Sequence, residues 1–443
     1  MTYMKSEIYS PAASPERVGA DGLNAFLDFL LILAVLYNSN SVWALAKDQF
    51  SVSCFVLLSI SVIYYSFLCF RKCHRSHYTI VPVVVISSLT FIMQVAIAFV
   101  HDGEGLLDGT WFQYTLIIPA LLGIFLIRGK NYIYKFFLPR LINLSVIIGV
   151  SGIVLWFLAC FTGLPPTSMT RLMWASGEEI DSYFGLFYKI QPITVAGMSI
   201  WRNTSIFPEA PMAAVYYGII LALNVLVSKQ KGLKNIIALT IVLITTMSTS
   251  AYMYILVLIF AYFSNKSTVN DLRESKIKML TMLLTATFLV FVLICIGVNK
   301  ITDSISGMTH LDDFIQGFRI WKDAPLFGFG FESDDYIWQE YLSYYRGGLG
   351  YTSGVLFLLI HGGVIALVML IVPLLAWMFA SPSKDSTYFA LFLFLILLTV
   401  VVQNCGVFIL CLSLGYANYV WENRRLRSEW NAVRGNRDIS STN

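Results

Sequence analysis

Charged residues are scarce in this chain. Only 13% of its 443 residues are Asp, Glu, Lys or Arg, whereas 57% are hydrophobic and 15% are aromatic. Soluble globular chains carry about 25% charged residues, so the composition excludes a soluble globular protein of this length. We therefore expect an integral membrane protein, in which Trp and Tyr gather at the two interfaces between lipid and water.

Several short motifs are missing as well. The seven cysteines show no CxxC or similar metal-ligand spacing, and all but Cys73 lie in or beside apolar segments, which argues against disulfides and against a metal centre. The first twenty residues contain no charged leader followed by a short apolar core, so we expect no removable signal peptide. No P-loop lysine and no nucleic-acid signature is present. We expect no metal, no cofactor and no nucleic-acid partner.

Long apolar runs are abundant. A helix needs about 20 apolar residues to cross roughly 30 Å of hydrocarbon. Twelve segments come near this length: 22–40, 50–70, 78–100, 112–128, 141–163, 210–228, 235–249, 250–264, 279–299, 354–380, 386–402 and 406–421. The seventh and eighth are short and almost continuous, so they form either two spans or a re-entrant hairpin.

The positive charges orient these spans. With the N-terminus in the cytoplasm, the cytoplasmic segments hold 22 of the 30 lysines and arginines, as the positive-inside rule requires. We predict one all-α polytopic membrane domain of residues 1–443, with both termini cytoplasmic and a basic, disordered tail at 422–443. Two large external loops remain, 164–209 and 300–353, for which we expect short amphipathic helices. The one acid well inside a span is Asp28.

The second external loop contains a helical pattern. Apolar residues recur at helical spacing and polar residues recur on the opposite face, until a proline at position 325 ends the pattern. The apolar set is Leu311, Phe314, Ile315, Phe318 and Trp321, and the polar set is Asp312, Gln316, Arg319 and Asp323. This predicts a helix on the membrane surface that presents Arg319 to headgroups, although such a helix can also merely support a loop.

The first external loop ends in an arginine and a glutamate. Arg202 precedes the sixth span, and Glu209 lies where that helix begins. Arginine can hold a phosphate through two parallel charged hydrogen bonds, and a carboxylate can accept a proton from a hydroxyl nucleophile. The simpler interpretation is that Glu209 complements the helix dipole while Arg202 reaches for water at the membrane edge.

Two further features have simpler explanations. Glu332, Asp334 and Asp335 could bind a divalent cation, but solvated loop acids are commoner, so we favour no metal site. His361 lies in an apolar helix before two glycines, and we interpret it as a packed or pore-lining residue and not as a catalytic one.

Together these features resemble a known superfamily. About twelve spans, two large external loops with arginines, the segment RNTSIFPEAPMAA (202–214) and the segment RIWKDAPLFGFGFES (319–333) resemble the O-antigen polymerases and ligases of bacterial envelopes. Arg319 and Gly330 match the arginine, ten residues, glycine spacing of the polymerase loops. The histidine of the ligase pattern is absent, since Thr352 and Ser353 precede Gly363 in that register, which favours a polymerase.

The resemblance implies a function. The substrate would be an oligosaccharide repeat unit on polyprenyl pyrophosphate in the bacterial inner membrane, with the lipid bilayer, a chain-length regulator and a flippase as partners. It implies Arg202 and Arg319 on the pyrophosphate and Glu209 as the base. Arg171, Arg346, Gly328 and Gly330 would bind substrate. The alternatives are an O-antigen ligase, or an exporter of polysaccharide or lipid-linked sugar.

Overall fold

Helices occupy every predicted span that lies within the described part of the chain. The computed structural model describes residues 15–46, 50–71, 77–101, 113–172, 178–195, 198–228, 232–265, 305–341, 351–380 and 383–440, so the predicted span at 279–299 lies outside it. The first helices are α1 (Pro15–Tyr37), α2 (Val42–Leu45), α3 (Phe50–Arg71), α4 (His77–Val100), η1 (Gln113–Ile117), α6 (Ile118–Arg128), α7 (Lys130–Tyr132), η2 (Ile133–Phe137) and α8 (Leu138–Phe161).

The later helices complete the bundle. They are α9 (Ala210–Ala222), η4 (Leu223–Val227), α10 (Leu233–Thr245), α11 (Thr249–Asn265), α13 (Ile305–Asp323), α14 (Asp334–Glu340), α15 (Gly354–Ala380), α16 (Lys384–Thr399) and α17 (Gly406–Ser440). Within the described residues, five helices are long and apolar enough to cross a membrane: Ser51–Arg71, Ile80–Val100, Lys130–Phe161, Ala210–Val227 and Gly354–Ala380. The chain is therefore a helical membrane protein.

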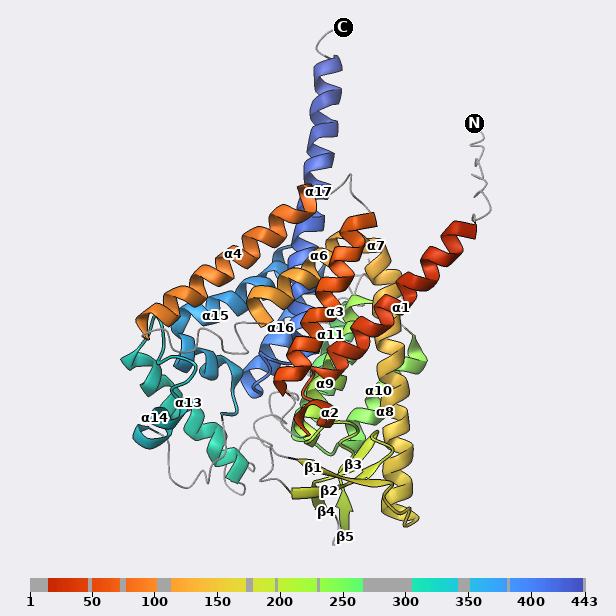
Figure 1. The fold of residues 1–443 in the computed structure, drawn as a ribbon, viewed down its shortest axis with the longest axis vertical. Helices are drawn as coiled ribbons and strands as arrows, with labels where there is room; N and C mark the ends of the chain where they lie inside the picture. The colour runs from red at the N-terminus through yellow and green to blue at the C-terminus, as the bar shows by residue number, and fades with distance from the viewer. Residues whose placement is uncertain are drawn as a thin grey trace, which may run out of the picture.

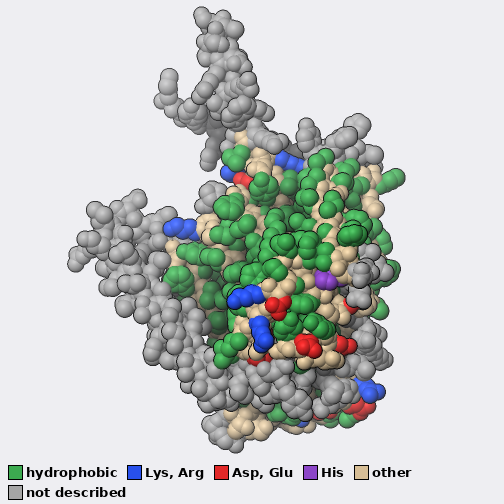
Figure 2. Space-filling model, turned by 90° about the vertical axis from the view of Figure 1, so that its left-hand side faces the viewer, with side chains coloured by type: hydrophobic (Ala, Val, Ile, Leu, Met, Phe, Trp, Pro, Cys, Tyr) green, Lys and Arg blue, Asp and Glu red, His purple; other side chains and the backbone are tan. Residues whose placement is uncertain are grey.

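The two ends of the bundle differ. The beginning of α1 and the end of α17 lie at the upper end in Figure 1, whereas α13, α14 and the strands of the first loop lie at the lower end. Between these ends, apolar side chains point outward, such as Ile92 and Phe99 on α4, which are 61% and 84% exposed. Figure 2 shows a broad band of hydrophobic side chains on this face, with charged side chains gathered along its lower border. Such a band suits contact with lipid.

The first loop forms strands, so the prediction of short helices there was wrong. A three-stranded antiparallel sheet contains β1 (Ser168–Leu172), β2 (Glu178–Tyr183) and β3 (Phe187–Lys189), and a hairpin contains β4 (Pro192–Val195) and β5 (Met198–Trp201). One side chain from each strand of the larger sheet is buried against Val42 of α2, namely Leu172, Ile180 and Tyr188. The strand register places these three side chains on the same face of the sheet, and that face packs on α2.

One further prediction needs correction, and one confirmed span contains a break. Helix α17 runs to Ser440, so the tail that begins at residue 422 continues a helix and is not disordered. The predicted span 354–380 is present as α15, and its helix is interrupted at Gly363, whose φ of 61° and ψ of −158° are not helical. Helices α10 and α11 have 13 and 17 residues, or about 20 and 26 Å, so both are shorter than the hydrocarbon layer.

Asp28 lies in a network at the upper end of the bundle. It is 1% exposed, and its carboxylate accepts hydrogen bonds of 2.6 Å from both Tyr64 and Tyr132 and forms an ion pair with Arg140. Arg128 donates to the Tyr64 hydroxyl through Nε at 2.8 Å. These groups come from α1, α3, α6, α7 and α8, so the network joins five helices. A buried acid that is paired in this way has a structural role.

Candidate functional site

The segment that connects β5 to α9 is held in place by many hydrogen bonds. The Asn203 backbone NH donates to the Thr245 carbonyl at 3.1 Å, and the Asn203 side-chain NH₂ donates to the Thr245 hydroxyl at 2.9 Å. Ser205, whose φ is 48°, bonds the Tyr217 hydroxyl at 2.8 Å. Ile206 and Phe207 are completely buried. Because both ends and the middle of the segment are fixed, Arg202 and Glu209 project from a rigid support.

Arg202 is half-buried and carries an unused donor. Its backbone NH donates to the Gln191 carbonyl at 2.9 Å, but its side-chain Nε is buried and has no hydrogen-bond partner among the described residues. Burial lowers the pKa of Arg202, and the nearby Glu209 and Tyr252 partly offset this effect. A guanidinium withdrawn from water without a hydrogen-bond partner is costly, which makes it a good receptor for an anion.

Glu209 does not perform the helix-capping role that its position suggests. It occupies the N-cap of α9, yet its side chain makes no capping hydrogen bond. The Ala210 NH donates instead to the Gln191 side-chain oxygen at 3.0 Å. Burial raises the pKa of Glu209 from 4.5 to about 7, with a smaller opposing effect from Arg202. A carboxyl with that pKa exchanges protons readily near neutral pH.

Arg202 and Glu209 influence each other without touching. Each shifts the pKa of the other through charge, but none of the ion pairs within 4 Å in the described part of the chain joins them. The arrangement leaves an unsaturated cation and a proton acceptor side by side at the lower end of the bundle. It can therefore bind an anionic group while a neighbouring hydroxyl loses its proton.

The second loop contains the predicted helix, but two of its acids, Asp312 and Asp313, are buried. Helix α13 ends at Asp323, before Pro325, as the sequence indicates. Asp312 was assigned to the solvated polar face, yet Asp312 and Asp313 are 5% and 2% exposed, because Asp313 accepts a 2.5 Å hydrogen bond from the Thr352 NH. The apolar residues face outward instead, led by Ile315 at 59% exposed. This exposed apolar stripe is what a helix on a membrane surface presents to lipid.

Arg319 lies on the exposed side of α13, which packs against α15. Among the described residues, no hydrogen bond or ion pair connects it with Arg202 or Glu209. Arg171 is exposed on β1, where it lies opposite Glu179 in the register with β2. Arg346 lies outside the described residues. The structure therefore brings two of the predicted site residues together, Arg202 and Glu209.

Gly328 and Gly330 lie where the second loop crosses the interruption in α15. The Phe329 NH donates to the Ile360 carbonyl at 2.8 Å, and the Gly330 NH donates to the His361 carbonyl at 2.9 Å. Gly328 has φ 65°, and a Cβ there would lie 2.5 Å from the Ile360 oxygen. These contacts satisfy helix carbonyls that the break at Gly363 leaves open. The two glycines thus have a packing role, and the substrate role that the resemblance implies for them stays a prediction.

His361 is packed, in agreement with its interpretation from sequence. It is completely buried among aromatic rings, with Phe357 at a centroid distance of 4.4 Å. Its Nδ1 lies 2.9 Å from the Gly330 carbonyl oxygen, and its Nε2 lies 3.3 Å from the Asp334 carboxylate. Since a carbonyl oxygen only accepts, Nδ1 carries a hydrogen. The histidine links α15 to the second loop.

Two residues near the candidate site were missed from sequence. Gln191 caps α9 and holds the Arg202 backbone, and Tyr252 of α11 lies near Arg202. Neither lies in a recognisable motif, because both reach the site only through the tertiary fold.

Within the described residues, no group of three or more His, Cys, Asp or Glu side chains is arranged to hold a metal ion. No known family model and no curated protein matches this chain.

Proposed function

We propose that this membrane protein is a polysaccharide polymerase that joins oligosaccharide repeat units carried on polyprenyl pyrophosphate at the outer face of the bacterial cytoplasmic membrane. One observation carries the proposal. Arg202 is half-buried without a hydrogen-bond partner for its Nε, beside a glutamate whose side chain does not cap its helix. A pyrophosphate leaving group needs a cation that is free to stabilise its charge, and a hydroxyl nucleophile needs a carboxylate that is free to take its proton.

In this proposal twelve helices cross the membrane and both termini are cytoplasmic. The beginning of α1 and the end of α17 share one end of the bundle, opposite the strands and α13, which supports this topology. Helix α13 would then lie at the outer surface with its apolar stripe in lipid. Arg202 and Glu209 would lie at the same level, where the headgroups of lipid-linked substrates meet water.

The chemistry follows from these positions. A sugar hydroxyl of one repeat unit attacks the carbon that bears pyrophosphate on the other substrate, forming a glycosidic C–O bond. The bond from that carbon to the pyrophosphate oxygen breaks, and its electron pair leaves with the lipid pyrophosphate. Arg202 stabilises the negative charge on the leaving group, and Glu209 accepts the hydroxyl proton.

The other predicted residues have supporting roles in the proposal. Arg319 supplies a second positive charge to the pyrophosphate from the second loop, and Arg171 and Arg346 guide the anionic substrates toward the site. Gly328 and Gly330 position the loop that carries Arg319, through their contacts with α15. A flippase would deliver the substrate and a chain-length regulator would set the product length.

The test is a gel of surface glycans from a strain that lacks this chain and is complemented with variants. We expect wild type to restore a ladder of long polymer, while Arg202→Ala and Arg319→Ala leave acceptors with one repeat unit. Lys189→Ala and Lys322→Ala are matched controls. Lys189 is a cation of the first loop paired with Asp181 at 3.9 Å, and Lys322 is exposed one helical turn beyond Arg319.

The outcomes separate the proposal from its rivals. A normal ladder with Arg202→Ala protein at wild-type level in the membrane contradicts the proposed role of Arg202. Bare acceptors with accumulated lipid-linked polymer in the deletion strain indicate a ligase instead. An unchanged ladder in the deletion strain would favour an exporter of another cargo.

A further inference from the structure

Gln191 contacts both segments that carry the candidate site. Its backbone carbonyl accepts the Arg202 NH at 2.9 Å, and its side-chain oxygen accepts the NH of Ala210, the first residue of α9, at 3.0 Å. The next residue, Pro192, favours an extended backbone at Gln191 and pairs with Trp201 in the hairpin of β4 and β5. A single residue therefore holds the end of β5 and the beginning of α9 in a fixed relation.

The helix end that Gln191 caps is also within the chain's own reach of Glu209. Glu209 is the N-cap residue of α9, with an extended backbone (φ −145°, ψ 149°), and its carbonyl accepts the Ala213 NH at 3.0 Å. The open NH groups and the dipole of a helix start attract a carboxylate. Pro211 offers no NH there, and the Ala210 donor is already used by Gln191. The Glu209 side chain makes no capping hydrogen bond to any residue that the structure describes.

The proposed reaction needs a capped helix and a free carboxylate at the same place. If the Glu209 carboxylate bonded the start of its own helix, those bonds would favour its charged form and make it a weaker base. We propose that Gln191 is a positioning residue, which occupies the Ala210 donor and thereby keeps the Glu209 carboxylate free beside Arg202. Its effect on rate rests on the proposed function, whereas its effect on Glu209 can be measured without any activity.

The electrostatics of the site agree with this role. Burial raises the pKa of Glu209 to about 7, with a smaller opposing effect from Arg202. A capping bond to the helix start would lower that pKa instead. Because the side-chain amide of Gln191 is uncharged, it completes the helix end without placing a second charge beside the Glu209 carboxylate.

The experiment compares two substitutions of Gln191 in the full-length protein in phosphatidylcholine nanodiscs. Gln191→Met keeps the length of the side chain but lacks the oxygen acceptor, and Gln191→Glu keeps an oxygen acceptor but adds a negative charge. Infrared difference spectra as a function of pH record the protonated carboxyl of Glu209, which is identified by the loss of its band in Glu209→Gln. Membrane extracts with lipid-linked repeat units give the polymerisation rate per folded molecule at each pH.

The two substitutions should move the titration in opposite directions. In Gln191→Met the Ala210 donor is released and Glu209 takes the cap, so we expect the pKa of Glu209 to fall from about 7 toward 4.5, its ordinary value. The rate at pH 7 should fall by about tenfold to 10²-fold, because the base is misplaced. In Gln191→Glu the cap is kept and the like charge should raise the pKa of Glu209. This variant should recover more rate at alkaline pH than Gln191→Met.

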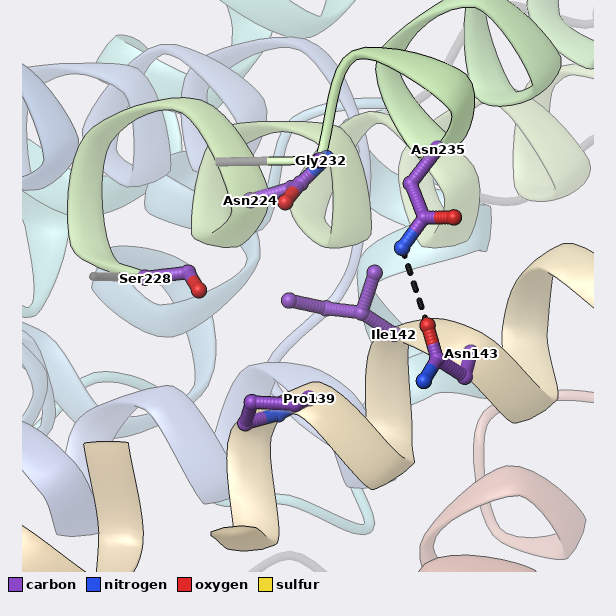
Figure 3. A pocket seen from close by; sticks show the side chains of 7 residues that line it. All are labelled: Pro139, Ile142, Asn143, Asn224, Ser228, Gly232 and Asn235. Atoms are coloured by element: carbon purple, nitrogen blue, oxygen red, sulfur yellow. Dashed lines mark hydrogen bonds between the residues drawn. The ribbon is translucent and has the colours of Figure 1, made fainter. Parts of the chain in front are cut away.

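Asn235→Leu is the matched control. Asn235 of α10 donates a 2.9 Å hydrogen bond to the Asn143 side-chain oxygen of α8, and both line a pocket of about 320 Å³ (Figure 3). The variant thus also removes one amide hydrogen bond that joins two elements near a helix start. Asn235 lies roughly 15 Å along α10 from Thr245, which bonds Asn203 beside the site. We expect a lower unfolding temperature with the Glu209 titration unchanged.

The proposal is overturned if Glu209 titrates in Gln191→Met as it does in wild type, or if Asn235→Leu moves the titration equally far. Should Gln191→Met not fold, an unchanged Glu209 titration in Gln191→Glu overturns it alone. The polymerase is judged separately. A shifted titration in Gln191→Met supports the role of Gln191 even where wild type makes no polymer, whereas polymer from wild type with unshifted titrations contradicts only the role of Gln191.

Discussion

Asp28 and Glu209 are both withdrawn from water, and each has an arginine near it, but their surroundings differ. Asp28 receives two tyrosine hydroxyls and forms an ion pair with Arg140. Glu209 makes no hydrogen bond through its carboxyl in the described part of the chain, and Arg202 acts on it only through charge. A carboxylate whose hydrogen bonds are all made stabilises the fold, whereas a carboxylate without hydrogen bonds retains its capacity to react. The comparison predicts that substitution of Asp28 will reduce stability, whereas substitution of Glu209 will reduce activity.

The largest expected effect is on activity. Glu209→Gln keeps the shape of the side chain but removes its ability to take a proton, so we expect polymerisation to fall by about 10²–10⁴-fold. Thermal unfolding of the purified variant should match wild type or exceed it, because a buried carboxyl has been neutralised. Membrane extracts with lipid-linked repeat units provide the rate. Wild-type activity in this variant would reduce Glu209 to a residue that begins a helix.

The next effect is on stability. Asp28→Ala leaves Arg140 and two tyrosine hydroxyls without their acceptor, so we expect a loss of roughly 3–5 kcal/mol in the free energy of unfolding. Denaturant unfolding in detergent measures it. Tyr132→Phe removes one bond to the same carboxylate and a 3.2 Å bond that Arg140 donates to the Tyr132 hydroxyl, so it should cost about 1–2 kcal/mol. If Asp28→Ala unfolds like wild type but loses activity, the contrast between the two acids fails.

A substitution at Gly328 distinguishes a structural role of the second loop from a role in binding substrate. An alanine there would place its Cβ 2.5 Å from the α15 backbone at a positive φ, so Gly328→Ala should destabilise the protein by about 1–3 kcal/mol. We expect polymer per folded molecule to be reduced much less than by Glu209→Gln. Surface-glycan gels normalised to folded protein provide the comparison. A stable variant with no activity would instead assign Gly328 to substrate binding.

The smallest expected effect is a dependence on pH. Since the pKa of Glu209 is about 7, the fraction of carboxylate, and with it the rate, should rise about tenfold between pH 5 and pH 6 and level off above 7. Stability should change in the opposite sense. The raised pKa favours the folded state below pH about 4.5, and this contribution is lost as the pH rises through 7. Both dependences should vanish in Glu209→Gln, and their persistence would assign them to another group.

The sequence was a good guide to the helices and a poor guide to the first loop. Long apolar runs specify membrane helices because lipid leaves the backbone no other partners, and α3, α4 and α15 begin and end within a few residues of the predicted positions. The five short strands escaped prediction because segments of three to six residues carry little periodic signal.

The candidate site was only partly predictable for a similar reason. Arg202 and Glu209 stand out in sequence because they flank a span, but their unsaturated state depends on Gln191, which takes over the helix cap. Arg319 matches a motif, yet it lies exposed on another element. The predicted polar face of α13 is only partly exposed, because Asp312 is buried beside Asp313, whose carboxylate accepts a bond from Thr352, whereas Arg319 and Asp323 are exposed.

Composition and hydrophobic runs alone determined that this chain is a helical membrane protein, because the cost of unpaired polar groups in lipid is set locally by each segment. Only the tertiary structure decided that α15 is broken where the second loop donates to its carbonyls, and that the Asp28 carboxylate has hydrogen-bond partners whereas the Glu209 carboxylate does not cap its helix. Each of these facts depends on hydrogen-bond partners distant in the chain, which no local pattern of residues records.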